Sequence, residues 1–551
     1  MTNLNSMWAE LIIEELIRNG VDYFCIAPGS RSAPLTIAAA RNKRAKTFVH
    51  FDERGLAFHA LGYTSATRKP CVLICTSGTA VGNFFPAIIE ASKKKLPLIV
   101  LTADRPPELQ KTGANQTIEQ NNIFGKYAKW TFEFPCPTPE IKPEFVLTTI
   151  DQAVFQAKSG MKGVVHLNCM FREPLTPKKT EKRIAYSVER LGPYTTYEKL
   201  DAIRYTLDAK TLDAIKSIKN GLIVVGKIPL SGSHAQAVLH LAEKLQFPIF
   251  PDVTSGLRLG IDHPNLIHYY DLLLAENKLK NFKPDGIIHL GGRITSSRYY
   301  EFIKSLSPKT LKSYITVISH PLRNDPLHIV THRIQSCVGQ FCMTVNEKIP
   351  SRPQSAQLLS LKKLSESTNS KLTKLENSKT LSEEAVARLI SRLILKNSGL
   401  FLSSSLPVRH MDTYAAYDGN PVIVGSNRGA SGIDGTIASA IGFAKGLNNP
   451  TTLLIGDLAF LHDLNSLAML KDLKVPLTIV VLNNNGGGIF HKLPVSQVKD
   501  AFIKYFKTPH NLNFKQIGNV FNLENYAVKS MKDFARAYKN KGKKIIVCNG
   551  C

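Results

Sequence analysis

Residues 456–490 constrain the fold of this chain more than any other stretch. An apolar segment, 452–455, is followed by Gly456 and Asp457, and a second apolar segment, 477–482, is followed by the polar loop 483–488. Between the two segments, spacings of three and four residues predict a helix from Leu464, Leu467, Ala468 and Leu470. A strand, a helix and a strand in this order predict a parallel pair, whose polar ends meet at one edge of a sheet.

The residues at that edge offer oxygen atoms to a ligand. The Asp457 carboxylate, an asparagine side-chain carbonyl of loop 483–488 and a main-chain carbonyl of its glycines are the hard oxygen ligands that Mg²⁺ prefers beside phosphate oxygens. We therefore predict a Mg²⁺-diphosphate site. The alternative is an ordinary strand–helix–strand unit that ends in a polar loop.

The same alternation of strands and helices extends over most of the chain. It predicts an α/β protein of three doubly wound parallel-sheet domains. We place the first at 1–185, a central domain at 186–350 and a third at 381–551. Residues 351–380 are rich in Ser, Lys, Gln and Asn, and we expect a solvated linker with helical tendency.

Composition narrows the class of protein. The net charge is +27, but the lysines are spread along the chain without a nucleic-acid-binding signature, which favours a lysine-rich solvated surface and no nucleic-acid partner. We expect no signal peptide and no segment that spans a membrane. Nine scattered cysteines favour a reducing, cytoplasmic location. The terminal pair Cys548 and Cys551 has redox or zinc-ligand spacing, but it is isolated.

A second acidic motif lies in the first domain. In the sequence HFDERG, residues 50–55, a predicted strand delivers Glu53 to the start of a helix. Such an acid is favoured by the helix dipole alone. The separation of 27 residues between Asp457 and Asn484 fits the metal motif of thiamine-diphosphate enzymes, which also carry one glutamate on a separate domain.

At this point the chain resembles a known family. Its motifs occur in the order of the 2-succinyl-5-enolpyruvyl-6-hydroxy-3-cyclohexene-1-carboxylate (SEPHCHC) synthases of menaquinone biosynthesis, and they cover essentially the whole chain. They are APGSRSAPL at 27–35, HFDERG at 50–55, TSGTA at 76–80, TADRPP at 102–107, NQTIEQ at 115–120, SNRGASGIDG at 426–435, GD at 456–457 and NNNGG at 483–487. Leu458 follows the Gly-Asp pair where related decarboxylases carry glycine.

The resemblance implies thiamine diphosphate held with Mg²⁺ or Mn²⁺. Asp457, Asn484 and the Gly486 carbonyl would bind the metal. Glu53 would bond the pyrimidine ring and activate the cofactor, and Ile433 would support its bent conformation. The active site would form between chains of a homodimer or homotetramer.

The resemblance also implies decarboxylation of 2-oxoglutarate and addition of the succinyl unit to isochorismate. Both substrates are anions that arginine binds well. The implied oxoacid residues are Ser405, Arg409 and Arg428; the isochorismate residues are Ser30, Arg31, Arg105, Asn115 and Gln116; the apolar wall is Ile489, Phe490 and Leu493. Glu53, Arg31, Gln116 and Arg409 are the expected catalytic residues.

One position departs from the family pattern. Ser297 precedes Arg298 where the better-known members have lysine, so we expect Arg298 alone to reach the substrate from the central domain. Two other functions stay open. The first is another thiamine-diphosphate decarboxylase or carboligase, and the second is a non-catalytic basic scaffold that binds nucleic acid or anionic membrane.

Overall fold

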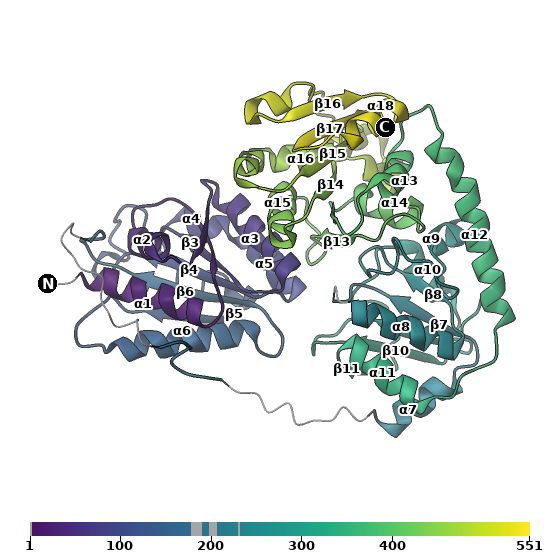
Figure 1. Cartoon of the computed structure of the whole chain (residues 1–551), viewed down its shortest axis with the longest axis horizontal. Helices are drawn as coiled ribbons and strands as arrows, with labels where there is room; N and C mark the ends of the chain where they lie inside the picture. The colour runs from purple at the N-terminus through teal and green to yellow at the C-terminus, as the bar shows by residue number, and fades with distance from the viewer. Residues whose placement is uncertain (1–2, 178–189, 198–206, 230–231) are drawn as a thin grey trace. The chain divides into compact units, whose positions relative to one another are not determined.

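The computed structural model describes residues 3–177, 190–197, 207–229 and 232–551 (Figure 1). The described residues form three sheets in which every strand pair is parallel. The prediction of three parallel α/β sheets is therefore confirmed. The expected boundary between residues 185 and 186 lies outside the described residues.

The N-terminal sheet has the strand order β2-β1-β3-β4-β6-β5. Its strands are β1 (Tyr23–Ile26), β2 (Lys46–Val49), β3 (Cys71–Cys75), β4 (Leu98–Asp104), β5 (Ala128–Phe134) and β6 (Val164–Met170). Strands β1, β3, β4 and β6 are buried along their whole length. They carry continuous apolar runs because helices cover both faces of a parallel sheet.

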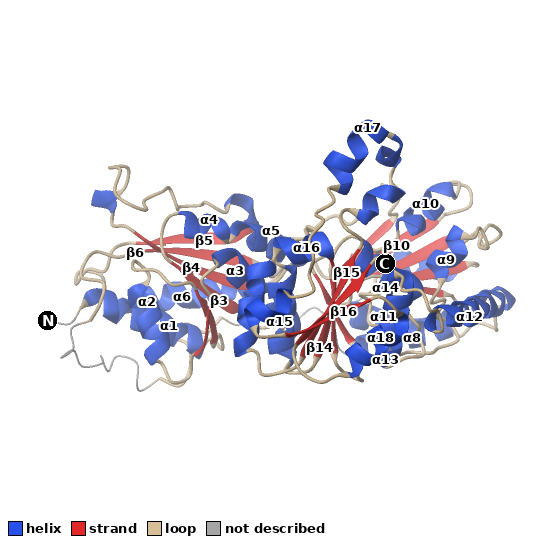
Figure 2. Ribbon diagram, turned by 90° about the horizontal axis from the view of Figure 1, so that it is seen from above, coloured by secondary structure: helices blue, strands red, loops and turns tan. Residues whose placement is uncertain are grey.

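Helices lie on both faces of this sheet (Figure 2). Helices α1 (Leu4–Arg18), α2 (Ala33–Arg41) and α6 (Pro143–Lys158) share one hydrophobic core around Trp8. The remaining helices are α3 (Glu53–Thr67), α4 (Thr79–Asn83) and α5 (Phe85–Lys94), with short 3₁₀ turns at Pro107–Leu109 and Gly125–Tyr127.

The central sheet has the order β11-β10-β9-β7-β8. Its strands are β7 (Gly221–Val225), β8 (Ile249–Pro251), β9 (Gly286–Leu290), β10 (Ser313–Ile318) and β11 (His332–Gln335). Its helices are α7 (Ala209–Ser217), α8 (Gly232–Leu245), α9 (Tyr270–Ala275), α10 (Ser297–Ser305) and α11 (Val338–Lys348). The stretch that we expected to be a linker contains the 21-residue helix α12 (Ala356–Glu376).

The C-terminal sheet has the order β13-β12-β14-β15-β17-β16. Its strands are β12 (Gly399–Leu402), β13 (Ile423–Ser426), β14 (Thr451–Gly456), β15 (Leu477–Asn483), β16 (Glu524–Val528) and β17 (Lys544–Asn549). Numbered within each sheet, this order is the same as that of the N-terminal sheet. In both sheets the order reverses beside the first strand, and ligands bind at such a switch point in open parallel sheets.

Helices and tight turns connect the C-terminal strands. The helices are α13 (Glu383–Leu393), α14 (Leu406–Tyr414), α15 (Thr436–Leu447), α16 (Asp457–His462), α17 (Lys499–Phe502) and α18 (Met531–Lys539). Tight 3₁₀ turns occur at Gly488–Lys492, Pro494–Gln497 and Ile517–Phe521, and a π-helical turn at Ile503–Lys507. Helices α13, α14 and α18 contribute to one core.

The prediction of a single α-helix around Leu464 is wrong in detail. Helix α16 starts at Asp457 and ends at His462, and a 3₁₀-helix, η4 (Leu464–Asp472), follows. Asp463 separates them because its backbone leaves the helical region, and its buried carboxylate accepts hydrogen bonds from the Ala438 N–H and the Ser466 hydroxyl. The three-residue spacing of the leucines also fits a helix with three residues per turn.

The chain packs as two compact units. Unit 1 comprises Met1–Leu200, Asn427–Asn448 and Ala459–Val475, and unit 2 comprises Asp201–Ser426, Asn449–Leu458 and Pro476–Cys551. Within unit 1, α3 packs closely against α15. A Cβ atom at Gly62 of α3 would collide with the carbonyl oxygen of Ser439 in α15. Glycine at this position therefore lets the two main chains touch.

Candidate active site

Asp457 and Gly486 lie together at the ends of β14 and β15. The Gly486 N–H donates to Asp457 Oδ2 at 2.8 Å, and the Leu458 N–H donates to Asp457 Oδ1 at 2.7 Å. Gly486 has a φ of +133°, which favours glycine, and a Cβ there would collide with the Lys507 carbonyl. The structure thus brings together two of the three predicted metal ligands.

Asn484, the third predicted metal ligand, lies in the same loop as Gly486. Its amide nitrogen donates to Glu383 Oε1 at 2.7 Å, whereas its Oδ1 is buried and has no hydrogen-bond partner among the described residues. Leaving such an acceptor unsatisfied costs about 1–3 kcal/mol. A bound cation would satisfy this oxygen. The residues present therefore fit a metal ion that prefers oxygen ligands, such as Mg²⁺.

A further residue that was not predicted from the sequence, His510, lies beside Asp457. His510 Nε2 lies 3.3 Å from Asp457 Oδ2, and both side chains are almost fully buried. Burial raises the pKa of Asp457 above its ordinary value, while the two N–H donors and His510 oppose that rise. The histidine is distant in sequence, and no local pattern connects it with Asp457.

The terminal cysteines, Cys548 and Cys551, lie close to this loop and are not joined by a disulfide. Burial and the nearby Glu383 raise the pKa of Cys551 to about 12, and burial, Cys551 and Glu383 raise the pKa of Cys548. Thiols in this state are poor metal ligands and poor nucleophiles. All nine cysteines are free.

Glu53 is the first residue of α3. The preceding residue, Asp52, caps the helix by accepting hydrogen bonds from the N–H groups of Arg54 and Gly55 at 2.9 and 3.3 Å. The Glu53 carboxylate is therefore not needed as the cap. It is half-buried, and Asn83 Nδ2 lies 3.4 Å from its Oε2.

Two arginines of the N-terminal domain converge at the ends of β1 and β4. Arg31 donates to the Phe171 carbonyl at 2.9 Å, and Arg105 contacts the Ser77 hydroxyl and donates to the Gln116 carbonyl at 3.0 Å. Both side chains are 8% exposed. Burial and the charge of Arg31 lower the pKa of Arg105. Two neighbouring guanidinium groups of this kind suit an anionic ligand.

The other predicted residues of this region lie on exposed loops. Ser30 is exposed beside Arg31, and Asn115 and Gln116 are exposed in the loop after β4. Gln116 has a φ of +55° and its main chain approaches Gly78. The structure thus brings Arg31, Arg105 and Gln116 together, with Ser77 as an additional neighbour.

A buried network that the sequence did not reveal fixes these loops. Gln120 accepts a hydrogen bond from the Gly78 N–H at 2.9 Å and donates to Asn168 Oδ1 at 2.9 Å. Asn168 in turn donates to Asp104 Oδ2 at 2.8 Å. Burial raises the pKa of Asp104, and the hydrogen bonds that its carboxylate accepts from Asn168 and from the Arg105 N–H oppose the rise. Asp104 ends β4 and Asn168 lies in β6, whereas Gly78 and Gln120 lie on the loops after β3 and β4, so only the folded sheet brings these residues together.

Ser405 and Arg409 lie at the start of α14, directly after β12. Ser405 has a φ of +72° and Arg409 donates to its carbonyl at 2.5 Å.

Arg298, at the start of α10, pairs with Asp271 Oδ2 at 2.7 Å and is 47% exposed. The structure therefore gives Arg298 a structural partner within its own domain.

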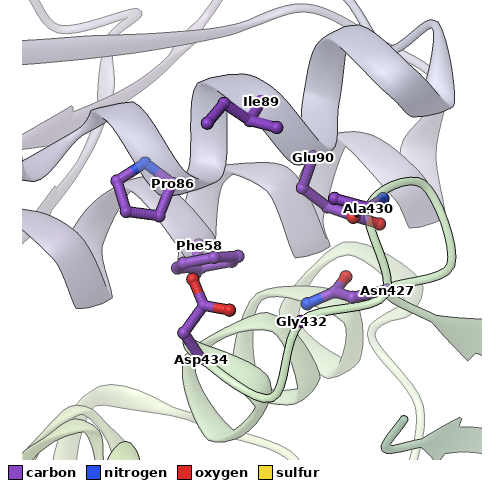
Figure 3. Close-up of a pocket in the computed structure, with 8 residues that line it drawn as sticks. All are labelled: Phe58, Pro86, Ile89, Glu90, Asn427, Ala430, Gly432 and Asp434. Carbon is purple, nitrogen blue, oxygen red and sulfur yellow. Dashed lines mark hydrogen bonds between the residues drawn. The ribbon is translucent and has the colours of Figure 1, made fainter.

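Arg428 and Ile433 lie on the loop 427–435 in unit 1. Glu90 of α5 holds this loop by accepting hydrogen bonds from the N–H groups of Gly429 and Ala430 at 2.7 and 2.5 Å. A cavity of about 240 Å³ lies beside it (Figure 3). The cavity is lined by Phe58, Pro86, Ile89, Glu90, Asn427, Ala430, Gly432 and Asp434. Ile433 is only half-buried.

The residues of the predicted apolar wall follow loop 483–488, which carries the predicted metal ligands Asn484 and Gly486 and is called the metal loop below. Ile489 and Phe490 are half-buried in the turn Gly488–Lys492, and Phe490 packs edge-on against Phe506 at 5.8 Å between ring centroids. Leu493 is 44% exposed. An apolar side chain left this accessible beside the metal loop is available for a ligand.

Three segments of the chain match known domain families. Residues 7–123 match "Thiamine pyrophosphate enzyme, N-terminal TPP binding domain", 182–402 match "Middle domain of thiamine pyrophosphate", and 409–547 match "Thiamine pyrophosphate enzyme, C-terminal TPP binding domain". A solved structure of a putative thiamin diphosphate-dependent enzyme from Mycobacterium smegmatis has the same fold, with a TM-score of 0.72 at 17% identity and 98% coverage of both chains. The chain is a thiamine-diphosphate-dependent enzyme.

Curated relatives define the family more narrowly. The chain is 44% identical over 539 residues to the SEPHCHC synthase of Rubrobacter xylanophilus, covering 97% of this chain and 93% of the relative. It is 43% identical over 548 residues to that of Chlorobium phaeobacteroides, with 97% and 92% covered. This protein belongs to the SEPHCHC synthase family, as its sequence motifs predicted.

Proposed function

We propose that this protein catalyses the thiamine-diphosphate-dependent decarboxylation of 2-oxoglutarate and the 1,4-addition of the resulting succinyl unit to isochorismate. The products are SEPHCHC and CO₂, and the reaction belongs to menaquinone biosynthesis. The identity of 44% to a synthase of that name over 97% of the chain carries the proposal.

The C-terminal domain holds the cofactor's diphosphate through a metal. We assign the metal to Asp457, Asn484 and the Gly486 carbonyl, and the unpartnered Asn484 Oδ1 supports this assignment. Oxygen donors alone favour Mg²⁺, with Mn²⁺ as an alternative occupant. When bound, the cofactor supplies a carbon nucleophile and an electron sink, which no side chain provides.

Glu53 moves the proton that starts the reaction. Its carboxylate lies at the first position of α3 and would hold the pyrimidine ring of the cofactor by a hydrogen bond, through which it would exchange a proton. Since Asp52 already caps the helix, Glu53 is available for this role. A positioned carboxylate of this kind contributes about 10²- to 10⁴-fold to rate.

Arginines bind and orient the two anionic substrates. We assign Ser405, Arg409 and Arg428 to 2-oxoglutarate, and Ser30, Arg31, Arg105, Asn115 and Gln116 to isochorismate. The adjacent guanidinium groups of Arg31 and Arg105 support the second assignment. Ile489, Phe490 and Leu493 exclude water from the reacting centre. Arg298 joins the isochorismate side only if it leaves Asp271.

We also propose a homodimer or homotetramer whose active sites form between chains. Two large apolar side chains just before Glu53 support this assembly, since Val49 is 54% and Phe51 is 64% exposed. A second copy of the chain would bury them.

None of the helices in the described part of the chain has the length and apolarity needed to cross a membrane. Free cysteines suit a reducing compartment, and we propose the cytoplasm.

An assay of the purified protein tests the function. The protein is incubated with Mg²⁺, thiamine diphosphate, 2-oxoglutarate and isochorismate, and CO₂ and SEPHCHC are measured. We expect CO₂ release from 2-oxoglutarate to depend on isochorismate. Efficient turnover of pyruvate without SEPHCHC formation would instead identify another decarboxylase or carboligase of this class. Salt-sensitive binding to nucleic acid without thiamine-diphosphate binding would identify a scaffold.

A further inference from the structure

Glu383 is a buried acid outside the predicted site, and it lies directly behind Asn484. It is the first residue of α13, it is 7% exposed, and it is 101 residues away from Asn484 in sequence. The first turn of a helix stabilises a negative charge. This position explains how a carboxylate is tolerated inside the C-terminal domain.

The contact between the two side chains has a defined direction. A carboxylate only accepts hydrogen bonds, so Glu383 Oε1 selects the amide nitrogen of Asn484, at 2.7 Å. The opposite end of the amide, Oδ1, then faces away from Glu383, and no atom in the described part of the chain forms a hydrogen bond with it. The two ends of an asparagine amide have nearly the same shape, so packing alone does not distinguish them.

A third residue holds Glu383 from the other side. His410 Nε2 lies 2.8 Å from Glu383 Oε2, and both side chains are buried. His410 belongs to α14, next to Arg409. Glu383 therefore connects the metal loop with the helix that carries the proposed oxoacid residues.

We propose that Glu383 is a positioning residue for metal binding, which fixes the Asn484 amide so that its oxygen, and not its nitrogen, faces the cation. Without Glu383 either end of the amide faces the metal position, and the N–H end repels a cation. Groups that orient a metal ligand in this way contribute about 10- to 100-fold to metal affinity. The inference rests on the proposed function, because it requires that the loop bind a divalent cation.

The test measures metal affinity without using activity. Mn²⁺ is titrated into the full-length protein with saturating thiamine diphosphate, and free Mn²⁺ is read from its electron paramagnetic resonance signal. Glu383→Gln keeps the shape of the side chain but can donate as well as accept, so it no longer selects one end of the amide. We expect its Kd for Mn²⁺ to rise about tenfold or more. Glu384→Gln removes the same charge one position along the helix, and its Kd should equal that of the wild type.

A compensating variant separates positioning from general structural support. In Glu383→Gln/Asn484→Asp the donor and acceptor are exchanged, and a carboxylate at 484 presents oxygen whichever way it turns. We expect this double variant to regain the Mn²⁺ affinity that Glu383→Gln loses. Unchanged Mn²⁺ affinity in Glu383→Gln overturns the inference and leaves the proposed function intact. So does a loss that the second substitution does not restore and that comes with a lower Tm. Absence of metal-dependent cofactor binding in the wild type overturns both.

Discussion

The N–H of Gly486 donates a 2.8 Å hydrogen bond to Asp457 Oδ2, 29 residues earlier in the chain. This bond joins the ends of β14 and β15, so the carboxylate and the main chain of the glycine loop are held side by side. The Asp457 carboxylate has a second oxygen that accepts from Leu458. The arrangement orders the loop before any ligand arrives.

We expect Asp457→Asn to abolish metal-dependent cofactor binding while the fold is retained. The amide can still accept one hydrogen bond, but it brings an N–H group and no charge to the cation. The Kd for thiamine diphosphate at fixed Mg²⁺ should rise by at least about 100-fold, measured by calorimetry. Removal of Mg²⁺ from the wild type with a chelator should reproduce this loss. Tight cofactor binding by the variant would contradict the metal assignment.

Glu53→Gln should leave stability nearly unchanged, because Asp52 provides the helix cap. Loss of one charge at the first turn of α3 changes stability by about 1 kcal/mol or less. The rate of hydrogen–deuterium exchange at C2 of the bound cofactor should fall by about 10²- to 10⁴-fold. Asp52→Asn is the matched control, with exchange near the wild-type rate. Wild-type exchange in Glu53→Gln would refute the role of Glu53.

Arg409→Ala should raise the KM for 2-oxoglutarate far more than the Kd for thiamine diphosphate. A charge-assisted hydrogen bond contributes about 1.5–3 kcal/mol, so we expect an increase of roughly 10- to 100-fold. Arg298→Ala serves as a comparison, since Arg298 already pairs with Asp271. A parallel increase in both constants for Arg409→Ala would show that the arginine supports the fold instead.

Mixing two inactive variants tests whether the active site forms between chains. Glu53→Gln and Asp457→Asn carry their defects on different domains. If each site combines Glu53 of one chain with Asp457 of another, a mixed dimer contains one intact site. Random exchange should then restore about a quarter of wild-type activity. Either variant alone is the control. No recovery, with exchange verified by mass spectrometry, would place the whole site within one chain.

We expect the free energy of unfolding to depend on pH through the buried His59. It is fully buried, it contacts the Tyr23 hydroxyl at 2.9 Å, and burial lowers its pKa to about 3. The folded state keeps this imidazole neutral, whereas the unfolded chain binds a proton below about pH 6.5. Stability from this residue is therefore complete above pH 6.5 and is lost as the pH falls toward 3.

His59→Gln should flatten this dependence. Between about pH 6 and 4, the free energy of unfolding of the wild type should fall by roughly 1 kcal/mol per pH unit more steeply than that of the variant. Urea titrations at several pH values measure the two slopes. Buried His166 also has a lowered pKa, of about 4, but it is present in both proteins and its effect cancels. Equal slopes would contradict the prediction.

The sequence predicted those parts of the site that follow directly from local pattern. Asp457 and Asn484 each follow an apolar strand, and the parallel order of those strands brings them to one edge. Glu383 and Glu90 could not be found in this way. Each contacts a loop that is 101 or more residues away, and no spacing rule connects an acid at the start or inside of a helix with such a loop. The 3₁₀ geometry of η4 was also missed, because leucines three residues apart suit either type of helix.

The main-chain contact at Gly62 restricts the distance between two proposed cofactor contacts, Glu53 and Ile433. Helix α3 begins at Glu53, and α15 begins three residues after Ile433, so both proposed cofactor contacts extend from helices that touch without intervening side chains. Side chains can change rotamer and shift neighbouring helices, whereas two backbones in contact leave no free distance between them. Because we propose that each site takes Glu53 from one chain and Ile433 from another, these two residues of one chain serve two different sites, and even one added methyl group at position 62 would alter the spacing between those sites.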